Sequence, residues 1–352
     1  MQTGCKRFLN IILILFSYFL SRFTKRAYHH GMPVSAGIEP NNTCNLHCPE
    51  CPAGTRELTR PQGFMDPALF RSAIDQLSPH LAYLTLYFQG EPYLSKKLFD
   101  YIAYARSRKI YVATSTNGHF FNETTVKQTI DSGLNRLIIS LDGFDQQSYG
   151  QYRKGGDFGK VIDGIRLLVS EKKKLNSRHP EIILQCLILR TNEHHLDEIK
   201  KLGRELGVNQ TIFKTAQFND FKDGNPLMPE NLKYARYREK VTKSQSHKVG
   251  EFLFRYFDIS IFHPLTISPS SRFTIKNHLP NSCFRMWSSC VITWDGKVVP
   301  CCFDKDATNL LGELKKQSFK EIWNGKLAHD FRQKVLQNRK GIEICSNCSQ
   351  TF

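Results

Sequence analysis

Three cysteines in one short run carry the clearest chemistry in this chain. Cys44, Cys48 and Cys51 are spaced C-x3-C-x2-C. Cysteine thiolates are the usual ligands of iron–sulfur clusters, so these three can hold three corners of a 4Fe–4S cluster. Because the run has no fourth cysteine, one iron would stay open to a small molecule and could pass it an electron. A partial zinc site that includes His47 is the alternative, although structural zinc sites have four ligands.

Four later cysteines make a second set: Cys283, Cys301, Cys345 and Cys348. We expect residues 294–299 to form a hairpin with Asp-Gly at its turn, which would bring Cys301 back near Cys283. Four thiols form a closed site. The set therefore predicts a closed metal site, which an iron–sulfur cluster or a zinc ion could occupy.

The other cysteines have no ligand role in this interpretation. Cys290 and Cys302 are surplus to the second set and are interpreted as buried or supporting thiols. Cys186 and Cys5 are interpreted as unrelated, with lipidation of Cys5 as an alternative. An odd total of 11 cysteines in 352 residues argues against a disulfide framework. It favours a reducing compartment and so predicts a cytoplasmic protein.

A repeating strand–helix rhythm begins near residue 34 and must position these thiols. Six β/α units in series predict an α/β fold with a parallel sheet covered by helices. Six is fewer than the eight of a closed TIM barrel, so we predict a partial (β/α)6 TIM-like barrel with its active site at the C-terminal strand ends. The expected strands are 34–39, 81–88, 110–115, 136–141, 181–189 and 211–214, and the expected helices are 67–76, 97–108, 124–132, 161–174 and 195–206.

Polar residues with binding chemistry follow these predicted strands. Glycine permits close backbone approach, a carboxylate can accept hydrogen bonds from an ammonium group, and arginine pairs with a carboxylate. Each motif alone could be turn chemistry, but they follow consecutive strands in order. The candidates are Gly90, Glu91 and Pro92 after the second strand, Thr116 and Asn117 at the third, Ser140, Asp142 and Arg153 at and after the fourth, Arg190 at the fifth and Lys214 at the sixth. Arg190 and Lys214 could also be ordinary surface residues.

Four regions follow from this organisation. Residues 1–30 form a basic and apolar N-terminal segment, and residues 31–216 form the partial barrel. Residues 217–282 are interpreted as a linker or insertion with one helix at 230–242. Residues 283–352 form a small cysteine-containing domain that follows the barrel.

The N-terminal segment departs from the pattern of the rest. Residues 9–20 are apolar and are flanked on both sides by Lys and Arg. The stretch is short for a membrane-spanning helix, which needs about 20 apolar residues, and no A-x-A-like cleavage site follows. We expect an interfacial helix on the inner face of a membrane, or else a helix packed on the protein or a partner. The net charge of +17 is mostly spread over the chain, and no nucleic-acid-binding motif is present, so we expect no nucleic-acid partner.

Taken together, these motifs resemble the radical S-adenosylmethionine (SAM) enzyme superfamily. The resemblance rests on the cysteine run, the Gly-Glu pair, the Thr-Asn-Gly and Ser-x-Asp-Gly elements and the later arginine, in that order. The stretch from Cys283 to Cys348 resembles a SPASM/twitch-type extension, and its shorter, twitch-like version with one auxiliary cluster fits best. The resemblance covers residues 34–352. Glu50 stands where the family usually has an aromatic residue, and Gln89 where it has a glycine.

The resemblance implies a mechanism. SAM would bind the open iron, with residues 90–92 at its amino group and Thr116, Asn117, the Ser140/Asp142 element and the arginines near its ribose and carboxylate. Val208 would help to cover the adenine. An electron, supplied by a flavodoxin- or ferredoxin-type donor, would cleave SAM to methionine and a 5′-deoxyadenosyl radical, which takes a hydrogen atom from the substrate.

The substrate is expected to be a small molecule that is oxidised or rearranged. The alternative is a peptide or protein, as in related maturases. A second alternative is a non-catalytic iron–sulfur or zinc protein for binding or electron transfer.

Overall fold

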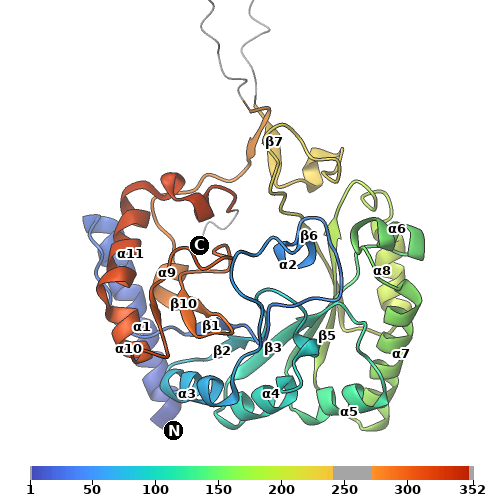
Figure 1. Cartoon of the computed structure of the whole chain (residues 1–352), viewed down its shortest axis with the longest axis horizontal. Helices are drawn as coiled ribbons and strands as arrows, with labels where there is room; N and C mark the ends of the chain where they lie inside the picture. The colour runs from blue at the N-terminus through green and yellow to red at the C-terminus, as the bar shows by residue number, and fades with distance from the viewer. Residues whose placement is uncertain (1, 241–270, 349–352) are drawn as a thin grey trace, which may run out of the picture.

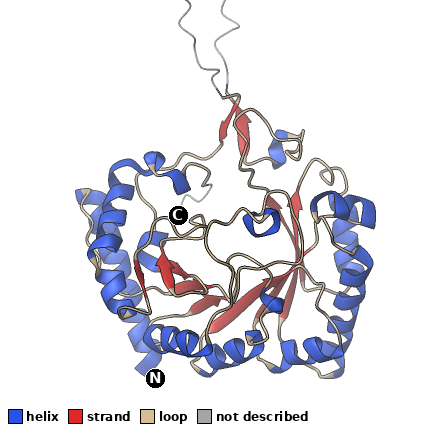
Figure 2. Cartoon of the chain, in the orientation of Figure 1, coloured by secondary structure: helices blue, strands red, loops and turns tan. Residues whose placement is uncertain are grey.

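The computed structural model describes residues 2–240 and 271–348. A curved nine-stranded sheet lies at its centre, with helices along its outer side (Figure 1 and Figure 2). Six of these strands are the predicted barrel strands, and they pair in parallel in chain order, which confirms the partial barrel. They are β1 (Ser35–Ile38), β2 (Tyr83–Thr85), β3 (Tyr111–Thr116), β4 (Arg136–Ser140), β5 (Glu181–Ile188) and β6 (Gln210–Thr215).

The helices that cover the barrel begin at side-chain caps. Asp66 accepts from the amides of Ala68 and Leu69 at the start of α3, and Asn122 forms a capping box at the start of α5. Their apolar faces pack on strand residues such as Leu84 and Val112, which are fully buried. The covering helices are α3 (Pro67–Leu77), α4 (Leu98–Ser107), α5 (Glu123–Asp131), α7 (Phe158–Lys174) and α8 (Leu196–Glu205), and shorter helical turns are α2 (Pro52–Thr55), η1 (Pro92–Leu94) and α6 (Gln146–Tyr152).

The C-terminal part continues the barrel sheet. Strand β9 (Ser289–Ile292) pairs in parallel with β1, and β10 (Lys297–Val299) and β11 (Gly312–Glu313) add antiparallel strands beyond it. The turn between β9 and β10 contains Gly296 at φ +90°, so the predicted hairpin is present. The helical elements of this part are α9 (Arg285–Ser288), α10 (Phe319–Asn324), α11 (Lys326–Asn338), η4 (Arg339–Gly341) and η5 (Glu343–Cys345).

The helix predicted at 230–242 is wrong over its described residues. The chain forms a 3-10 turn, η2 (Leu232–Tyr234), and then strand β7 (Tyr237–Glu239), which pairs with β8 (Phe273–Ile275). Tyr237 explains the difference, because its ring stacks on Phe221 at 4.5 Å and its hydroxyl accepts from the Phe218 amide at 2.9 Å. These tertiary contacts override the local helix propensity. Residues 241 and 242 lie outside the described residues.

The N-terminal helix α1 (Gln2–Thr24) is longer than the predicted apolar stretch and lies beside the C-terminal helices (Figure 1). Its buried face is partly polar: Asn10, Ser17 and Ser21 are buried together with Ile14. Asn10 exchanges two hydrogen bonds with the backbone of Met32, at 2.8 and 2.7 Å, because the chain returns along this face.

The opposite face of α1 is apolar and exposed. It carries Phe8, Leu9, Ile11, Ile12, Leu13, Leu15, Phe16, Phe19 and Phe23, with exposed fractions from 38% to 89%. By length and composition alone, the segment Gly4–Thr24 is suited to cross a membrane, and 28% of an apolar 18-residue window within it is buried against the protein. Most large apolar side chains of α1 thus face outward, whereas Asn10, Ser17 and Ser21 face inward, which is unusual for a surface helix.

Candidate functional site

The first cysteine set lies on the loop that leaves β1. Cys48 is buried, Cys44 and Cys51 are partly buried, and Cys51 caps the short helix α2. Two glycines allow this loop to pack closely. A Cβ on Gly54 would lie 2.8 Å from the Cys48 amide nitrogen, and a Cβ on Gly90 would lie 2.5 Å from the Thr43 carbonyl oxygen. The end of β2 therefore supports the cysteine loop directly.

Glu91 joins the ends of β2 and β3. Its carboxylate accepts from the Thr116 hydroxyl at 2.8 Å, the Asn117 amide at 2.8 Å and the Tyr93 amide at 3.0 Å. Full burial raises the pKa of Glu91 to about 7. The Asn117 side chain donates to Asn45 in the cysteine loop at 2.8 Å. The predicted residues at two strand ends are thus linked to each other and to the loop.

Asp142 and Arg153 form a buried ion pair beside Cys48. Arg153 Nε lies 2.5 Å from Asp142 Oδ2, and the other Asp142 oxygen accepts from the Leu187 amide at 2.7 Å. Arg153 Nη1 lies 3.8 Å from Cys48 Sγ. Ser140, two residues before Asp142, is buried at the end of β4. The positively charged guanidinium of Arg153 therefore lies next to the cysteine loop.

The structure places Arg190 apart from these residues. Its Nε donates to the Met228 carbonyl at 3.1 Å, and its guanidinium lies 3.8 Å from Glu230. Its described contacts thus lie with the segment after β6.

Glu50 contacts the same segment, because its carboxylate accepts from the Asn219 amide at 2.9 Å and from the Asn225 side chain at 2.8 Å. This tie, which sequence reasoning missed, gives a reason for a carboxylate at position 50.

The four later cysteines come together around Arg339. The thiols of Cys283, Cys345 and Cys348 lie close enough to the Arg339 guanidinium to raise its pKa. Arg339 Nη2 lies 3.6 Å from Cys348 Sγ. Cys301, returned by the hairpin, lies near Cys345 and Cys283. Of the two surplus thiols, Cys290 is buried as predicted, whereas Cys302 is exposed. Cys302 comes after the hairpin and lines an open cavity, which is described below.

The buried or partly buried thiols of each set have the chemistry that an iron–sulfur cluster needs. Burial raises the pKa of Cys44 to about 11 and that of Cys345 to about 11, so a bound metal must displace protons from both. Within residues 2–240 and 271–348, no three His, Cys, Asp or Glu side chains are grouped to hold a single metal ion.

A buried ion pair joins the cysteine loop to the C-terminal part. Arg60 donates two hydrogen bonds to Glu39, at 2.6 and 2.5 Å, and both side chains are almost fully buried. Glu39 also accepts from the amide of Trp294, in the β9–β10 turn, at 3.1 Å. Arg60 Nε donates to the Lys305 carbonyl at 2.7 Å. Nothing in the sequence marked this pair, because its partners lie in distant segments.

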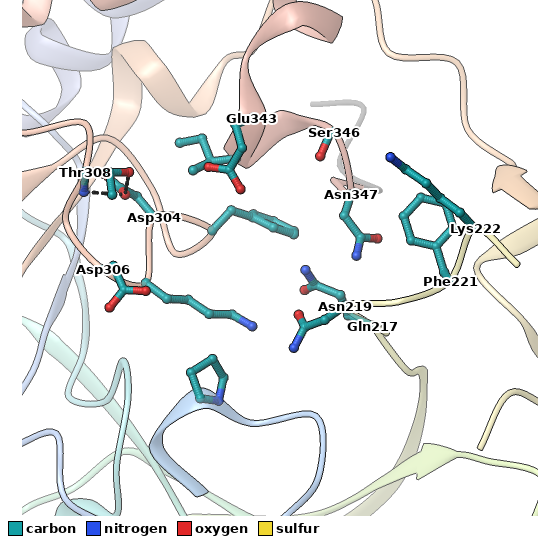
Figure 3. A pocket seen from close by; sticks show the side chains of 14 residues that line it. Gln217, Asn219, Phe221, Lys222, Asp304, Asp306, Thr308, Glu343, Ser346 and Asn347 are labelled. Atoms are coloured by element: carbon teal, nitrogen blue, oxygen red, sulfur yellow. Dashed lines mark hydrogen bonds between the residues drawn. The ribbon is translucent and has the colours of Figure 1, made fainter. Parts of the chain in front are cut away.

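A polar pocket of about 480 Å³ lies between the cysteine loop and the C-terminal part (Figure 3). Pro52, the residue after Cys51, lines one wall. Figure 3 shows Gln217 and Asn219 next to Asn347, whose side chain donates to the Phe218 carbonyl at 2.6 Å. The remaining walls come from residues 221–222, 303–306, 308, 343–344 and 346. A volume of this size is typical of small-molecule sites.

Comparisons with known proteins decide the family. Residues 38–203 match the radical SAM superfamily, and residues 283–349 match SPASM, an iron–sulfur cluster-binding domain. The chain belongs to the radical SAM superfamily. It is an enzyme of this superfamily, and its two domains imply a SAM-binding 4Fe–4S cluster, an auxiliary cluster and SAM.

Several relatives and a solved structure match most of this radical SAM enzyme. It is 24% identical to an AdoMet-dependent heme synthase of Methanosarcina barkeri, over 87% of this chain and 88% of that protein. It is 25% identical to a cysteine-type anaerobic sulfatase-maturating enzyme of Clostridium novyi, over 90% and 85% of the two chains. The fold matches the structure of anSMEcpe with bound AdoMet at a TM-score of 0.61 and 19% identity, covering 90% of this chain and 85% of that one.

Proposed function

We propose that this radical SAM enzyme abstracts a hydrogen atom from a small molecule, which it oxidises or rearranges. Cys44, Cys48 and Cys51 would hold the SAM-binding cluster, and the set around Arg339 would hold the auxiliary one. These groups supply a 5′-deoxyadenosyl radical and an electron acceptor when bound. The observation that carries the proposal is the pocket of about 480 Å³, one wall of which directly follows Cys51.

The protein residues have positioning roles in this proposal. Arg153 would offset the negative charge of the thiolate cluster beside Cys48, while Asp142 fixes its guanidinium. Glu91 would hold Thr116 and Asn117 at the strand ends that face SAM. Gly90, Pro92 and Ser140 would complete this surface. Arg190 has the weakest support, since its contacts lie with residues 228–230.

Anaerobic reconstitution with iron, sulfide, SAM and a reductant tests the catalytic proposal. We expect 5′-deoxyadenosine from the native enzyme, loss of it in Cys48→Ala, and retention in Cys5→Ala, whose thiol is exposed on α1. Two 4Fe–4S clusters require about eight irons per chain. No SAM cleavage by the native enzyme would refute the proposal. About four irons with one tightly bound zinc would refute the second cluster.

A labelling experiment separates the small-molecule substrate from a peptide. The enzyme is incubated with extracts of deuterium-grown cells, divided by ultrafiltration into small-molecule and macromolecular fractions. Hydrogen abstraction from the substrate would put deuterium into 5′-deoxyadenosine. We expect this label from the small-molecule fraction alone. Label from the macromolecular fraction alone would favour the peptide alternative, which is specifically supported by relatives such as PqqA peptide cyclase. A flavodoxin- or ferredoxin-type protein would serve as the electron donor.

We also propose that α1 binds the enzyme to the cytoplasmic face of a membrane. Its exposed face carries nine large apolar side chains, and a contiguous apolar surface of this kind is typical of a membrane or partner contact. Lys6, Arg22, Lys25 and Arg26 flank that face and suit anionic headgroups. Because α1 is held to the protein from Arg7 to Ser21, a helix lying in the interface fits better than a spanning one.

Flotation with anionic phosphatidylglycerol vesicles tests the membrane proposal. Replacing Phe8, Phe16 and Phe19 by Ser leaves the buried face of α1 intact. We expect vesicle binding to fall by two or more orders of magnitude, because burial of one such side chain contributes about 1.5–3 kcal/mol. Leu175→Ser, which changes an exposed apolar residue after α7, should leave binding unchanged. Equal vesicle binding by the triple variant and the native enzyme would exclude α1 as the anchor.

A further inference from the structure

A second cavity, of about 400 Å³, lies inside the curve of the sheet. Its walls come from β1, β2, β9 and the end of β6, so it lies within the partial barrel. The cavity contains the exposed thiol of Cys302, which the second cysteine set does not use. The residues that the argument uses are Tyr87, Lys214, Arg285 and Cys302.

The charges that line this cavity are all positive. Lys214 and Arg285 are its two cations, and no Asp or Glu is among its lining residues. In the part of the chain that the structure describes, Lys214 has no hydrogen-bond or ion-pair partner. Arg285 contacts Cys302 Sγ at 3.9 Å and pairs with no carboxylate of the described residues. Two neighbouring cations without a counter-charge make a binding site for an anion.

Electrostatics support this reading of Lys214. Lys214 is exposed at the cavity, and desolvation by the cavity wall, together with Arg285, lowers the pKa of its ammonium group, while Cys302 acts in the opposite direction. Burial raises the pKa of Tyr87 to about 12, which keeps its hydroxyl protonated as a hydrogen-bond donor. An anion between these groups would relieve the repulsion and accept their hydrogen bonds.

The two cations could instead neutralise the auxiliary cysteines, since Cys301 also lines the cavity. However, the positive charge of Arg339 already lies beside Cys283, Cys345 and Cys348. The one thiol that interacts electrostatically with Lys214 is Cys302, which is not a member of the set. The two cavity cations are therefore better explained by a group that enters the cavity.

We propose that Lys214 and Arg285 bind an oxyanion of the substrate, a phosphate monoester or a carboxylate, inside the barrel. This inference rests on the proposed function: the substrate would extend from the pocket beside Cys51, which Phe303 lines, into this cavity, which the neighbouring Cys302 lines. A guanidinium binds either oxyanion through two parallel hydrogen bonds, and an ammonium adds a point charge. Holding the substrate by a remote charged group fixes which of its carbons meets the radical.

Alkylation of Cys302 reports occupancy of the cavity without relying on turnover. The anaerobic holoenzyme, with SAM present, is treated with iodoacetamide while phosphate, acetate or glycerol is titrated, and Cys302 modification is read by peptide mass spectrometry. We expect saturable protection by phosphate or acetate and none by glycerol. Protection by one anion alone assigns that oxyanion class. Protection by neither anion would overturn the proposal.

Variants then test the two cations. In Lys214→Gln and Arg285→Gln the anion concentration for half protection should rise at least tenfold, whereas Lys334→Gln, which changes an exposed residue of α11, should match the native enzyme. Unchanged protection in both cavity variants would refute the assignment. So would a shifted auxiliary-cluster potential without loss of protection, since the cations would then serve the cluster. Substrate-free 5′-deoxyadenosine formation, measured on the same samples, tests the proposed function separately.

Discussion

Replacing Arg60 by Met should destabilise the protein strongly. The substitution keeps an unbranched side chain but removes the charge that pairs with Glu39. Glu39 is fully buried, so its carboxylate would remain in the interior without its ion-pair partner. Breaking a buried pair by removing one partner costs about 3–5 kcal/mol. The Lys305 carbonyl would also lose its donor, at 2.7 Å in the native protein.

The double variant Arg60→Met/Glu39→Gln should recover part of this loss. It removes both charges, and the one carbonyl oxygen of the new amide can accept from the amide of Gln89 or of Trp294, which donate to different carboxylate oxygens in the native protein. Because the other amide loses its acceptor, we expect the free energy of unfolding to lie about 1–3 kcal/mol below the native value. Arg136→Met is the matched control. Its partner Glu181 is 36% exposed, so this loss should stay below about 1 kcal/mol.

Urea unfolding, followed by circular dichroism under anaerobic conditions, measures these differences. Hydrogen exchange adds a local readout, because the amides of the β9–β10 hairpin should lose protection in Arg60→Met while those of α5 keep theirs. A loss below about 1 kcal/mol in Arg60→Met, or a double variant no more stable than the single one, would refute the reasoning.

Three further predictions concern the cysteine loop. Gly90→Ala should cost roughly 1–3 kcal/mol and lower iron loading, because Gly90 has φ +76° and the new Cβ would meet the Thr43 carbonyl at 2.5 Å; thermal unfolding and iron content measure this. Glu91→Gln should change the pH dependence of stability of the SAM-free protein. The pKa of folded Glu91, about 7, lies above its unfolded value near 4.5, so the native protein should lose roughly 3 kcal/mol as pH rises from 4.5 to 7, and the variant should not. Parallel stability curves of the two proteins would contradict this. Glu50→Ala should cost about 1 kcal/mol and increase trypsin cleavage at the exposed Lys222, because it removes the hydrogen bonds that the Asn219 amide and the Asn225 side chain donate to Glu50; unchanged cleavage would count against the tie.

Much of the barrel could be predicted, because its signals are local. Apolar runs at regular spacing marked the six strands, and helix stops such as Gly133 and Gly207, both at positive φ, marked the ends between them. The cysteine spacings are likewise local, and the second set did come together. The apolar stretch of α1 was also visible, but its inverted orientation depends on Asn10 and Ser17 meeting the returning chain.

Other features could not be predicted, because they depend on contacts between distant segments. Parallel pairing of β9 with β1 has no signature in either strand alone. Glu39 and Arg60 are ordinary charged residues in the sequence, and they become a central ion pair only once the hairpin covers them. The predicted helix at 230–242 failed for the same reason, since the stacking of Tyr237 on Phe221 outweighs local propensity.

The pairing of β1 with β9 also has a consequence for synthesis of the chain. Ser35 lies beside Ser289, so about 250 residues must be made after β1 before its second neighbour exists. At about 5–20 residues per second, that edge of β1 stays open on the ribosome for roughly 12–50 s. An open strand edge invites pairing with other chains. The barrel thus reaches its final form only near the end of translation, and slow or interrupted synthesis should favour aggregation over closure.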